Sequence, residues 1–520
     1  MRPQVLLSAA DMQAVDARAV AGGADGFALM RRAGEAVARQ VRRRVSRGTP
    51  IVVVAGSGNN GGDGAVCAAT LVAHGHDVTL LRAGGEPREG SDAERAFAAW
   101  EGPLLAVLPG ERASLAAALD AIAGAGYLVD ALFGAGLSRE VEGLFAELVR
   151  ALDRSAAPLL AVDLPSGLDG NEHRVRGVAA RATLTVSFVR LKPVHVLQPG
   201  RTLCGEVVIE DIGMPATALA DAPGNCLLNA PDVWRETLPR PAADDHKFRR
   251  GHVLVRGGPA RQSGAARLSA SAALQSGAGL VTLAVAPEAL TINAARLTAV
   301  MLRVVESVAD WRATFDDSRL STLLLGPGNG RDAHTRRATL DALASGRACV
   351  LDADALSCHG DAPGDFLSAL RAARGAVVLT PHDGELERLV GHTDIPSLPS
   401  RLHRARATAA LAGCVIVSKG SDSVVAAPDG RATIAVNAPP WLATAGAGDV
   451  LAGVVAALLA QGMPAFEAAS AAVWVHGEAA RTLGWPLTAE QLVVAVGEAL
   501  NRVAAFAPPA LPMLARGSTR

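Results

Sequence analysis

The sequence predicts two consecutive α/β domains, each built on a mainly parallel sheet. Three observations lead to this fold class. The chain has 520 residues, and single cores stop growing at about 250–300 residues. Short runs rich in Val, Leu and Ala recur along it, and most lead into a Gly-rich or polar turn and then a helical pattern. Between about 212 and 245 this regularity fades, so we predict a first domain over 1–220, a linker over 221–245 and a second domain over 246–510.

Composition argues against several classes of protein. The chain carries 50 basic and 51 acidic residues, so its charge predicts no nucleic-acid or membrane-surface partner. The longest apolar runs, such as Val450–Ala460, are too short to span a bilayer, and the N-terminus lacks a signal-peptide pattern. The six cysteines include no C-x-x-C pair, which is typical of reduced thiols. We expect a cytoplasmic protein, and a homo-oligomer whose state no sequence pattern identifies.

The first half begins with helices and continues with a βαβ unit. Residues 8–45 follow a helical period with one apolar face. A buried strand at 51–55 leads into a Gly-rich turn at 56–64, a helix at 65–75 and a second strand at 76–81. This order predicts a Rossmann-like three-layer domain whose ligand lies at the carboxyl edge of the sheet.

The Gly-rich turn carries polar side chains as well as glycines. Its spacing Gly56-x-Gly58-x-x-Gly61 matches a dinucleotide-binding fingerprint, but Arg82 stands where an acidic residue would hold a ribose. An ordinary dehydrogenase is therefore the least favoured function. Two amides and a carboxylate fill the gaps, and their oxygens suit a hard cation or a ligand with both donors and acceptors: Asn59, Asn60 and Asp63.

Two further strands end in comparable chemistry. The strand at 127–133 contains Asp130 and runs into a turn of small residues, and the strand at 159–163 ends in Asp163 shortly before Ser166. Each Asp alone could be a turn former or a helix cap. The ends of neighbouring strands converge at one edge of a parallel sheet. The three strand ends, those of the strands at 51–55, 127–133 and 159–163, therefore together favour a real site. Lys192, after a predicted strand at 184–190, is a further candidate, and a surface lysine is an equal alternative.

Residues 1–220 resemble the NAD(P)H-hydrate epimerase domain. The resemblance rests on GSGNNGGDG at 56–64, VDALFGAGL at 129–137 and VDLPSGLDG at 162–170. It implies that a potassium ion binds to side-chain oxygens of Asn60, Asp130 and Ser166, and that Asp163 contacts the substrate, where we expect it to move the proton. It also implies that the hydrated nicotinamide nucleotide is held by Asn59, Asn60, Gly61, Gly62, Asp63, Gly134, Ala135, Gly136, Leu137, Ser138, Arg139 and Glu140.

The second half repeats the alternation of strand and helix, which predicts a doubly wound α/β domain. Strands are predicted at 252–256, 280–285, 322–325, 349–351, 376–380 and 415–418. Polar residues again gather in the turns that follow. His382 could be a plain turn residue, Lys419–Ser423 a surface β-turn, and Asp352 and Asp354 buried caps.

The turn Thr444–Asp449 precedes a predicted helix at 450–459. Free N–H groups and the helix dipole would aim at one point there, which suits a phosphate. Asp449 could accept the proton of a hydroxyl that meets this phosphate, and the dipole is expected to keep it ionised. The alternative is an ordinary Gly-rich helix start. Neither a P-loop nor a protein-kinase motif is present.

The order GGP, GPGNG, LDADAL, PHDGE, KGSDS, TAGAGD resembles the ribokinase-like NAD(P)H-hydrate dehydratase domain over about 230–510. The family usually has Pro at Asp383 and Thr at Ser423; the added charge of Asp383 bears on substrate affinity. The resemblance implies that Mg²⁺ accompanies ADP as co-substrate and that Asp449 is catalytic. The substrate would meet Ala265, Gly328 and His382, and ADP would bind to Lys419, Gly420, Ser421, Asp422, Ser423 and Gly448.

These patterns predict a two-domain repair enzyme, an isomerase followed by a lyase, that returns both epimers of NAD(P)H hydrate to NAD(P)H at the expense of ADP. Two alternatives stay open. A small-molecule kinase fused to a Rossmann-like domain would accumulate a phosphorylated product. A nucleotide-sensing regulatory protein would bind both ligands without turnover.

Overall fold

The computed structural model describes residues 4–240 and 245–504. The chain divides into two compact units, one of Gln4–Leu227 and one from Leu228 onward. Residues 241–244 of the predicted linker and 505–510 of the predicted second domain lie outside the described residues. The described part of that linker contains short elements, namely β8 (Cys226–Leu228), α10 (Pro231–Trp234) and η1 (Arg235–Thr237).

The first unit is built on a seven-stranded sheet of order β3-β2-β1-β4-β5-β6-β7, in which every pair is parallel. The order reverses between β1 and β4, so this unit has its switch point there. The strands are β1 (Ile51–Ala55), β2 (Val78–Ala83), β3 (Leu104–Val107), β4 (Tyr127–Ala131), β5 (Leu159–Val162), β6 (Leu184–Phe188) and β7 (Glu206–Glu210).

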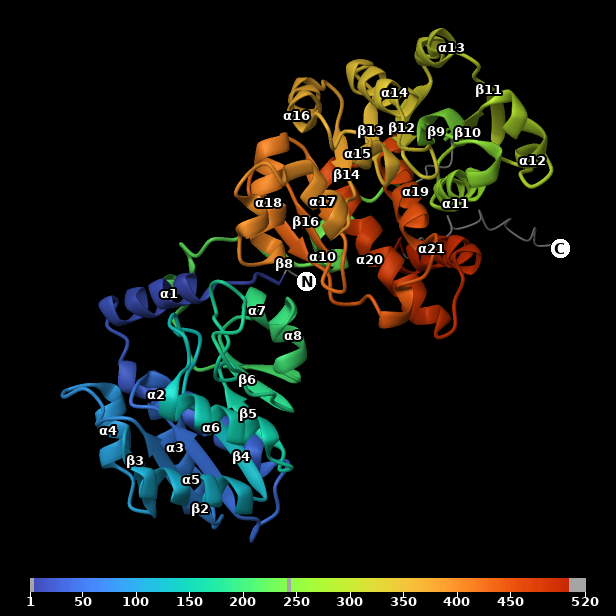
Figure 1. Ribbon diagram of the computed structural model, residues 1–520. Helices are drawn as coiled ribbons and strands as arrows, with labels where there is room; N and C mark the ends of the chain where they lie inside the picture. The colour runs from blue at the N-terminus through green and yellow to red at the C-terminus, as the bar shows by residue number, and fades with distance from the viewer. Residues whose placement is uncertain (1–3, 241–244, 505–520) are drawn as a thin grey trace, which may run out of the picture. The chain divides into compact units, whose positions relative to one another are not determined.

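Helices cover both faces of this sheet, which confirms the predicted three layers (Figure 1). Alternate side chains of a strand point to opposite faces. Ile51 and Val53 of β1 pack with α2 (Gly26–Arg42), α3 (Asn59–Ala73) and α4 (Asp92–Ala98). Val52 and Val54 pack with α5 (Arg112–Gly124) and α6 (Gly143–Arg154). The other helices of the unit are α1 (Ala9–Ala21), α7 (Pro193–Val196), α8 (Gly200–Leu203) and α9 (Ala216–Leu219).

Helix α3 begins at Asn59, six residues earlier than predicted, so most of the Gly-rich stretch is helical and the predicted turn is wrong from there on. Glycine is a poor helix former, but close packing requires it here. A Cβ on Gly61 would lie 1.7 Å from the carbonyl oxygen of Gly56, and one on Gly64 would lie 2.6 Å from the Ala131 side chain. The missing side chains let α3 start directly against the ends of β1 and β4.

The second unit is built on a ten-stranded sheet of order β11-β10-β9-β12-β13-β14-β15-β16-β17-β8. Its order reverses between β9 and β12, which confirms the doubly wound fold. The neighbouring strands of the part β11-β10-β9-β12-β13-β14-β15 pair in parallel, whereas β16 pairs antiparallel with both β15 and β17. The strands are β9 (His252–Arg256), β10 (Leu280–Val285), β11 (Met301–Val304), β12 (Leu320–Leu325), β13 (Ala348–Leu351), β14 (Val377–Leu379), β15 (Val415–Ser418), β16 (Val424–Ala426) and β17 (Ala432–Ile434).

One face of this sheet buries a large core against α11 (Ser263–Gln275), α19 (Ala447–Ala460), α20 (Ala465–Leu483) and α21 (Ala489–Ala504). Figure 1 shows α14, α16 and α18 across the sheet from these helices. The remaining helices are α12 (Leu290–Ala294), α13 (Val308–Ala313), α14 (Ala333–Ala344), α15 (Asp354–Ser357), α16 (Pro363–Ala372), α17 (Asp383–Val390) and α18 (Arg401–Ala412).

All six cysteines carry free thiols and are buried. Burial raises the pKa of Cys349 and Cys414 to about 12. Within the described residues, no helix is both long and apolar enough to cross a bilayer.

Candidate active sites

A cavity of about 800 Å³ lies at the switch point of the first sheet. Segments that follow β1, β4, β5 and β6 line it, so it occupies the predicted carboxyl edge. Of the residues predicted to hold substrate or move its proton, those that line it are Asn59, Asn60, Asp63, Gly134, Ala135, Gly136, Leu137, Ser138, Arg139 and Asp163.

Other predicted residues lie outside this lining. Gly61 and Gly62 pack α3 closely against its neighbours: a Cβ on Gly62 would lie 2.6 Å from the sulfur of Met30. Glu140 lies 3.7 Å from Arg176, and its side chain is 47% exposed. The two glycines therefore shape the wall, and Glu140 belongs to a surface ion pair.

Asp163 is held at the centre of a polar cluster. It follows β5 with φ 64°, a strained left-handed conformation for a non-glycine residue. Its Oδ2 accepts a hydrogen bond from the N–H of Ala135 at 3.0 Å. Its Oδ1 accepts one from the hydroxyl of Ser187 and one from Nζ of Lys192, both at 2.8 Å. Three segments of the chain thus fix one carboxylate.

Lys192 belongs to the site, so the surface-lysine alternative is wrong. The residue is 4% exposed, and its Nζ also donates to Ser187 at 3.0 Å. Burial alone would raise the pKa of Asp163, but the Lys192 charge and the hydrogen bonds outweigh it and lower that pKa to about 2. Asp163 is therefore ionised at neutral pH.

His195 supports this cluster from behind. Its Nδ1 accepts a hydrogen bond from the N–H of Lys192 at 3.0 Å, so its Nε2 carries the proton and donates to the carbonyl oxygen of Asp163 at 3.0 Å. Burial and the Lys192 charge lower the pKa of His195 to about 4. A neutral imidazole therefore joins the backbone of Lys192 to that of Asp163.

Two further carboxyl groups face the same cavity, and their pKa values are raised, whereas that of Asp163 is lowered. Burial raises the pKa of Asp16 on α1 to about 6, with Lys192 opposing the rise and Asp163 adding to it. Burial and the charges of Asp163 and Asp16 raise the pKa of Asp63 well above its usual range. When the environment of a cavity moves the pKa values of its carboxyl groups apart in this way, the groups with raised pKa values can donate a proton and the group with the lowered pKa stays an anion. The sequence reading missed Asp16 and its neighbour Gln13, because α1 lies far from the motifs along the chain.

The three predicted potassium ligands do not lie together at the cavity surface. Asp130 and Ser166 are fully buried and do not line the cavity. Asp130 accepts hydrogen bonds from the N–H and hydroxyl of Ser166 at 2.7 and 2.6 Å, and burial raises its pKa to about 6. Asn60 lies on the cavity side, and a Cβ on Gly134 would lie 2.9 Å from its Oδ1. Its buried Nδ2 has no hydrogen-bond partner among the described residues.

In the second unit, Asp449 lies within a helix and not before it. Helix α19 begins at Ala447, and Gly446 precedes it with φ 85° and no capping side chain. The expectation that the dipole keeps Asp449 ionised is wrong. Burial and the negative charges of Asp352 and Asp354 outweigh the opposing charge of Lys419 and raise the pKa of Asp449 to about 7.

Lys419 is not the surface lysine of the alternative, because its side chain is only 20% exposed, whereas Gly420–Ser423 do form the predicted turn, between β15 and β16. Its Nζ lies 2.7 Å from Oδ1 of Asp352 and 3.8 Å from Oε2 of Glu385. A Cβ on Gly448 would lie 3.4 Å from this Nζ, so the lysine and the start of α19 come together as predicted for a nucleotide site. Gly420 donates its N–H to the hydroxyl of Ser423 at 3.1 Å.

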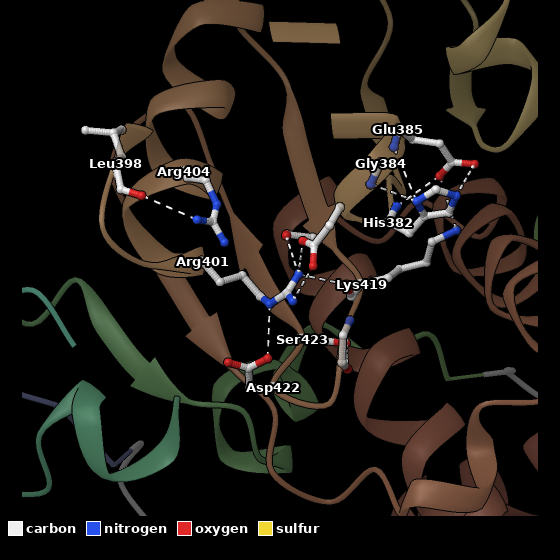
Figure 2. A network of polar contacts seen from close by, with 12 residues as sticks. His382, Gly384, Glu385, Leu398, Arg401, Arg404, Lys419, Asp422 and Ser423 are labelled. Carbon is white, nitrogen blue, oxygen red and sulfur yellow. Dashed lines mark hydrogen bonds and ion pairs between the residues drawn. The ribbon is translucent and has the colours of Figure 1, made fainter. Parts of the chain in front are cut away.

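Arg401 connects the turns on either side of this lysine (Figure 2). It forms a bidentate pair with Asp383 at 2.6 and 2.9 Å. It also donates to Oδ1 of the buried Asp422 at 3.0 Å and to the carbonyl oxygen of Lys419 at 2.8 Å. The negative charge of Asp383, which stands where the family usually has Pro, is therefore balanced by Arg401.

His382 caps α17, which agrees with its interpretation as a turn residue. Its Nδ1 accepts hydrogen bonds from the N–H groups of Gly384 and Glu385 at 3.0 and 3.3 Å, and its Nε2 lies 3.3 Å from Oε1 of Glu385 (Figure 2). Its side chain is still 55% exposed. The ring is thus fixed in orientation and open to solvent, and Glu385 links it to Lys419.

Ala265, the predicted substrate residue on α11, lies near the start of α19. The hydroxyl of Ser269 donates to the carbonyl oxygen of Asp449 at 2.9 Å and lies one turn after Ala265. Gly328 has φ 66°, and a Cβ there would lie 3.3 Å from that of Ala265. Ala265, Gly328 and Asp449 thus gather near the switch point between β9 and β12. Among the described residues, no three His, Cys, Asp or Glu side chains form a metal-binding group.

Two family models match the chain. Residues 26–194 match the YjeF-related protein N-terminus, and residues 253–494 match NAD(P)H-hydrate dehydratase. Among solved structures, the ADP/ATP-dependent NAD(P)H-hydrate dehydratase of Bacillus subtilis, co-crystallised with ATP/Mg²⁺, is 27% identical; the match covers 53% of this chain and 96% of that one, with a TM-score of 0.46.

Curated relatives match nearly the whole chain. The bifunctional NAD(P)H-hydrate repair enzyme Nnr of Pyrobaculum aerophilum is 36% identical over 526 residues, covering 96% of this chain and 98% of the relative. The enzyme of the same description from Thermofilum pendens is 34% identical over 463 residues, covering 86% of each. The chain therefore belongs to the family of bifunctional NAD(P)H-hydrate repair enzymes.

Proposed function

We propose that the first unit interconverts the two epimers of NAD(P)H hydrate and that the second unit dehydrates the (S)-hydrate to NAD(P)H at the expense of ADP. The observation that carries this proposal is the opposite tuning of the two candidate catalytic carboxyls. Asp163 has its pKa lowered to about 2 and Asp449 has its pKa raised to about 7. A fixed anion suits the epimerase reaction of the first unit, and a group that titrates near neutral pH suits the dehydratase reaction of the second unit.

In the epimerase cavity, a fixed anion suits a route through loss and return of water. The hydrate is a carbinolamine, so the lone pair of its ring nitrogen can expel the hydroxyl once that hydroxyl is protonated. Asp63, whose pKa is raised, would supply the proton, and water leaves with it. Asp163 would balance the positive ring, and water that returns to the other face gives the epimer and restores the proton to Asp63. Asp163 thus stabilises charge, and Asp63 takes the proton-transfer role first expected of Asp163.

The chemistry of Asn60, Asp130 and Ser166 fits a potassium ion. All three offer oxygen, and Asp130 is a desolvated carboxylate whose raised pKa a nearby cation would lower. The unpartnered amide of Asn60 would turn its oxygen toward that cation. Bound there, the ion would offset the acidic character of the cavity and fix Asn60 beside Gly134.

In the second unit, Asp449 would accept the proton of the substrate hydroxyl, because a pKa near 7 suits proton transfer at neutral pH. Lys419 and the N–H groups of Gly446–Gly448 would bind the phosphates of ADP. ADP supplies a phosphoryl group that makes the hydroxyl a leaving group. The ring nitrogen then expels phosphate, and the cation that results loses a proton from the carbon next to the reacting one, which the departing phosphate can accept, so that NAD(P)H, AMP and orthophosphate result. Mg²⁺ would be held mainly by the phosphates of the nucleotide.

Turnover of hydrated NADH with ADP and Mg²⁺, followed at the reduced-nicotinamide absorbance, tests this function. The wild-type chain should restore the full absorbance from a mixture of epimers and release orthophosphate. Asp449→Asn should stop recovery entirely. Asp163→Asn should spare the (S)-hydrate and only slow recovery of the other epimer.

Two outcomes would contradict the proposal. Accumulation of a phosphorylated hydrate without recovery of absorbance would assign a small-molecule kinase. Binding of both ligands without turnover in the wild-type chain, and without an effect of Asp449→Asn, would assign a nucleotide sensor.

A further inference from the structure

A second cavity of about 370 Å³ lies at the amino edge of the first sheet, opposite the Asp163 cavity. The end of α2, the segment that follows it and the connection from α3 to β2 form its wall. All but one of the residues that line it are basic, and none is acidic: Arg39, Arg42, Arg43, Val45, Arg47, His74 and His76.

The positive charge of this basic cavity is only partly balanced, by Glu210, whose pKa is lowered, against the effect of burial, by the charges of Arg39 and Arg43. Arg39 lies 2.9 Å from Oε2 of Glu210, and among residues 4–240 and 245–504 this is the only ion pair that the lining side chains form. Within the described part of the chain, Arg42, Arg43 and Arg47 have no carboxylate within 4 Å. Three guanidinium groups around one hollow repel one another unless an anion lies between them.

His76 supplies an independent sign of a missing ligand. It is 9% exposed and lines the cavity, and its Nδ1 is buried without a hydrogen-bond partner among the described residues. Its backbone N–H is held by the carbonyl oxygen of Leu71 at 3.1 Å. A buried polar atom without a partner is costly. An oxygen of an anion in the cavity would satisfy it.

Helix capping explains only part of this arrangement. α2 and α3 both end at the cavity, and basic residues at helix C-termini stabilise the carbonyl end of the dipole. His74 serves this purpose, because its Nδ1 donates to the carbonyl oxygen of Thr70 at 2.8 Å. Each helix end carries about half a negative charge, which is less than the charge of Arg42, Arg43 and Arg47 together.

We propose that this basic cavity binds a small polyphosphate anion, either free or as part of a nucleotide. Guanidinium groups match phosphate oxygens in pairs, and the hollow has room for a diphosphate. The site lies at the edge of the sheet away from the proposed reaction, so it goes beyond the repair function and does not depend on it.

Calorimetric titration of the full chain with inorganic pyrophosphate at low ionic strength tests this proposal. We expect saturable binding whose affinity falls about tenfold in Arg42→Ala and in Arg47→Ala, since each removes a charged hydrogen-bond donor. Arg31→Ala is the matched control, because Arg31 lies on α2, is 61% exposed and pairs with Glu35 away from the cavity. It should bind like the wild type.

Titration with ADP of a chain that carries Lys419→Met separates the two sources of the phosphate. If ADP binds more tightly than pyrophosphate and this binding is lost in Arg47→Ala, the cavity recognises a nucleotide. If ADP and pyrophosphate bind equally well, the cavity recognises the phosphate groups alone. The proposal is overturned if pyrophosphate does not bind, or if its affinity is unchanged in both arginine variants while their thermal stability falls, since the arginines then serve the helix ends. Repair activity of the same variants is measured separately, so failure of this site does not bear on the proposed reaction.

Discussion

A carboxyl group near a lysine occurs in both units and is tuned in opposite directions. In the first unit Lys192 contacts Asp163 directly at 2.8 Å and keeps it ionised. In the second unit Lys419 contacts Asp352 at 2.7 Å, so it only partly opposes the burial that raises the pKa of Asp449 to about 7. Because Lys192 contacts Asp163 itself, Asp163 is a fixed anion. Because Lys419 contacts Asp352 instead, Asp449 remains a titrating group.

The dehydration rate should depend on pH through Asp449. The proton acceptor is the ionised carboxylate, and its pKa of about 7 means that half of it is protonated at that pH. We expect kcat/KM to fall about tenfold for each pH unit below 7 and to level off above it. Initial rates between about pH 5.5 and 8.5 measure this. A rate that fell as pH rose through 7 would instead make Asp449 the acid.

Lys192→Met should destabilise the first unit. The change leaves the carboxylate of Asp163 buried without its charged partner, and the loss of one member of a buried pair costs about 3 kcal/mol. Urea denaturation measures this free energy of unfolding. In the double variant with Asp163→Asn the cost should be smaller than the sum of the single changes. Additive costs would mean that the two side chains do not interact.

At the level of elements, the sequence predicts what is periodic and local. The buried strands at 51–55 and 252–256 and the helices before 45 agree with the structure, because their apolar pattern matches their burial. The start of α3 was missed, because the close approach of Gly61 to Gly56 is a tertiary contact. β16 and β17 have three residues each, too few to show a period.

For the candidate sites too, the sequence predicts the residues that belong to a local pattern and misses those whose role depends on tertiary contacts. Motif residues at strand ends, such as Asp163, were found because parallel strands bring their ends together. Asp16 on α1 was missed, since no local pattern distinguishes it from a helical surface charge. The pKa of Asp449 was predicted in the wrong direction, because burial and Asp352 cannot be inferred from the residues next to it.

Gly61→Ala should disrupt the start of α3. A Cβ there would lie 1.7 Å from the carbonyl oxygen of Gly56, which is backbone and cannot move aside. We expect a loss of stability of about 3 kcal/mol together with the loss of epimerase activity. Gly58→Ala is the matched control in the same segment, since a Cβ there meets nothing within 4 Å. Thermal unfolding of both variants measures the difference.

The Arg401 network should tolerate loss of one carboxylate and not of the other. The side chain of Asp383 is 61% exposed and that of Asp422 is 5% exposed. An exposed pair contributes at most about 1 kcal/mol, so Asp383→Asn should change the KM for ADP by less than about fivefold. Asp422→Asn leaves a buried guanidinium under-compensated and should raise that KM about tenfold or more. Steady-state kinetics at varied ADP would measure both, and equal effects would contradict this assignment.

At the scale of the whole molecule, the chain forms two compact units with separate cores. We expect scanning calorimetry of the full chain to show two transitions. In the Arg47→Ala variant, whose basic cavity is disrupted, ADP at about 100 times its Kd should stabilise only the second unit, by about 2.7 kcal/mol. Asp449→Asn retains the phosphate-binding groups and should keep this shift. A shift of both transitions by ADP would show that the two cores unfold together.

Five of the buried thiols belong to one unit each, Cys67 and Cys204 to the first and Cys349, Cys358 and Cys414 to the second, whereas Cys226 lies in β8 at the boundary. Alkylating reagents attack the thiolate, so the native protein should stay unlabelled and each unit should acquire its label only when it opens. The chain therefore carries its own set of reporters, from which mass spectrometry can read which half has lost its fold.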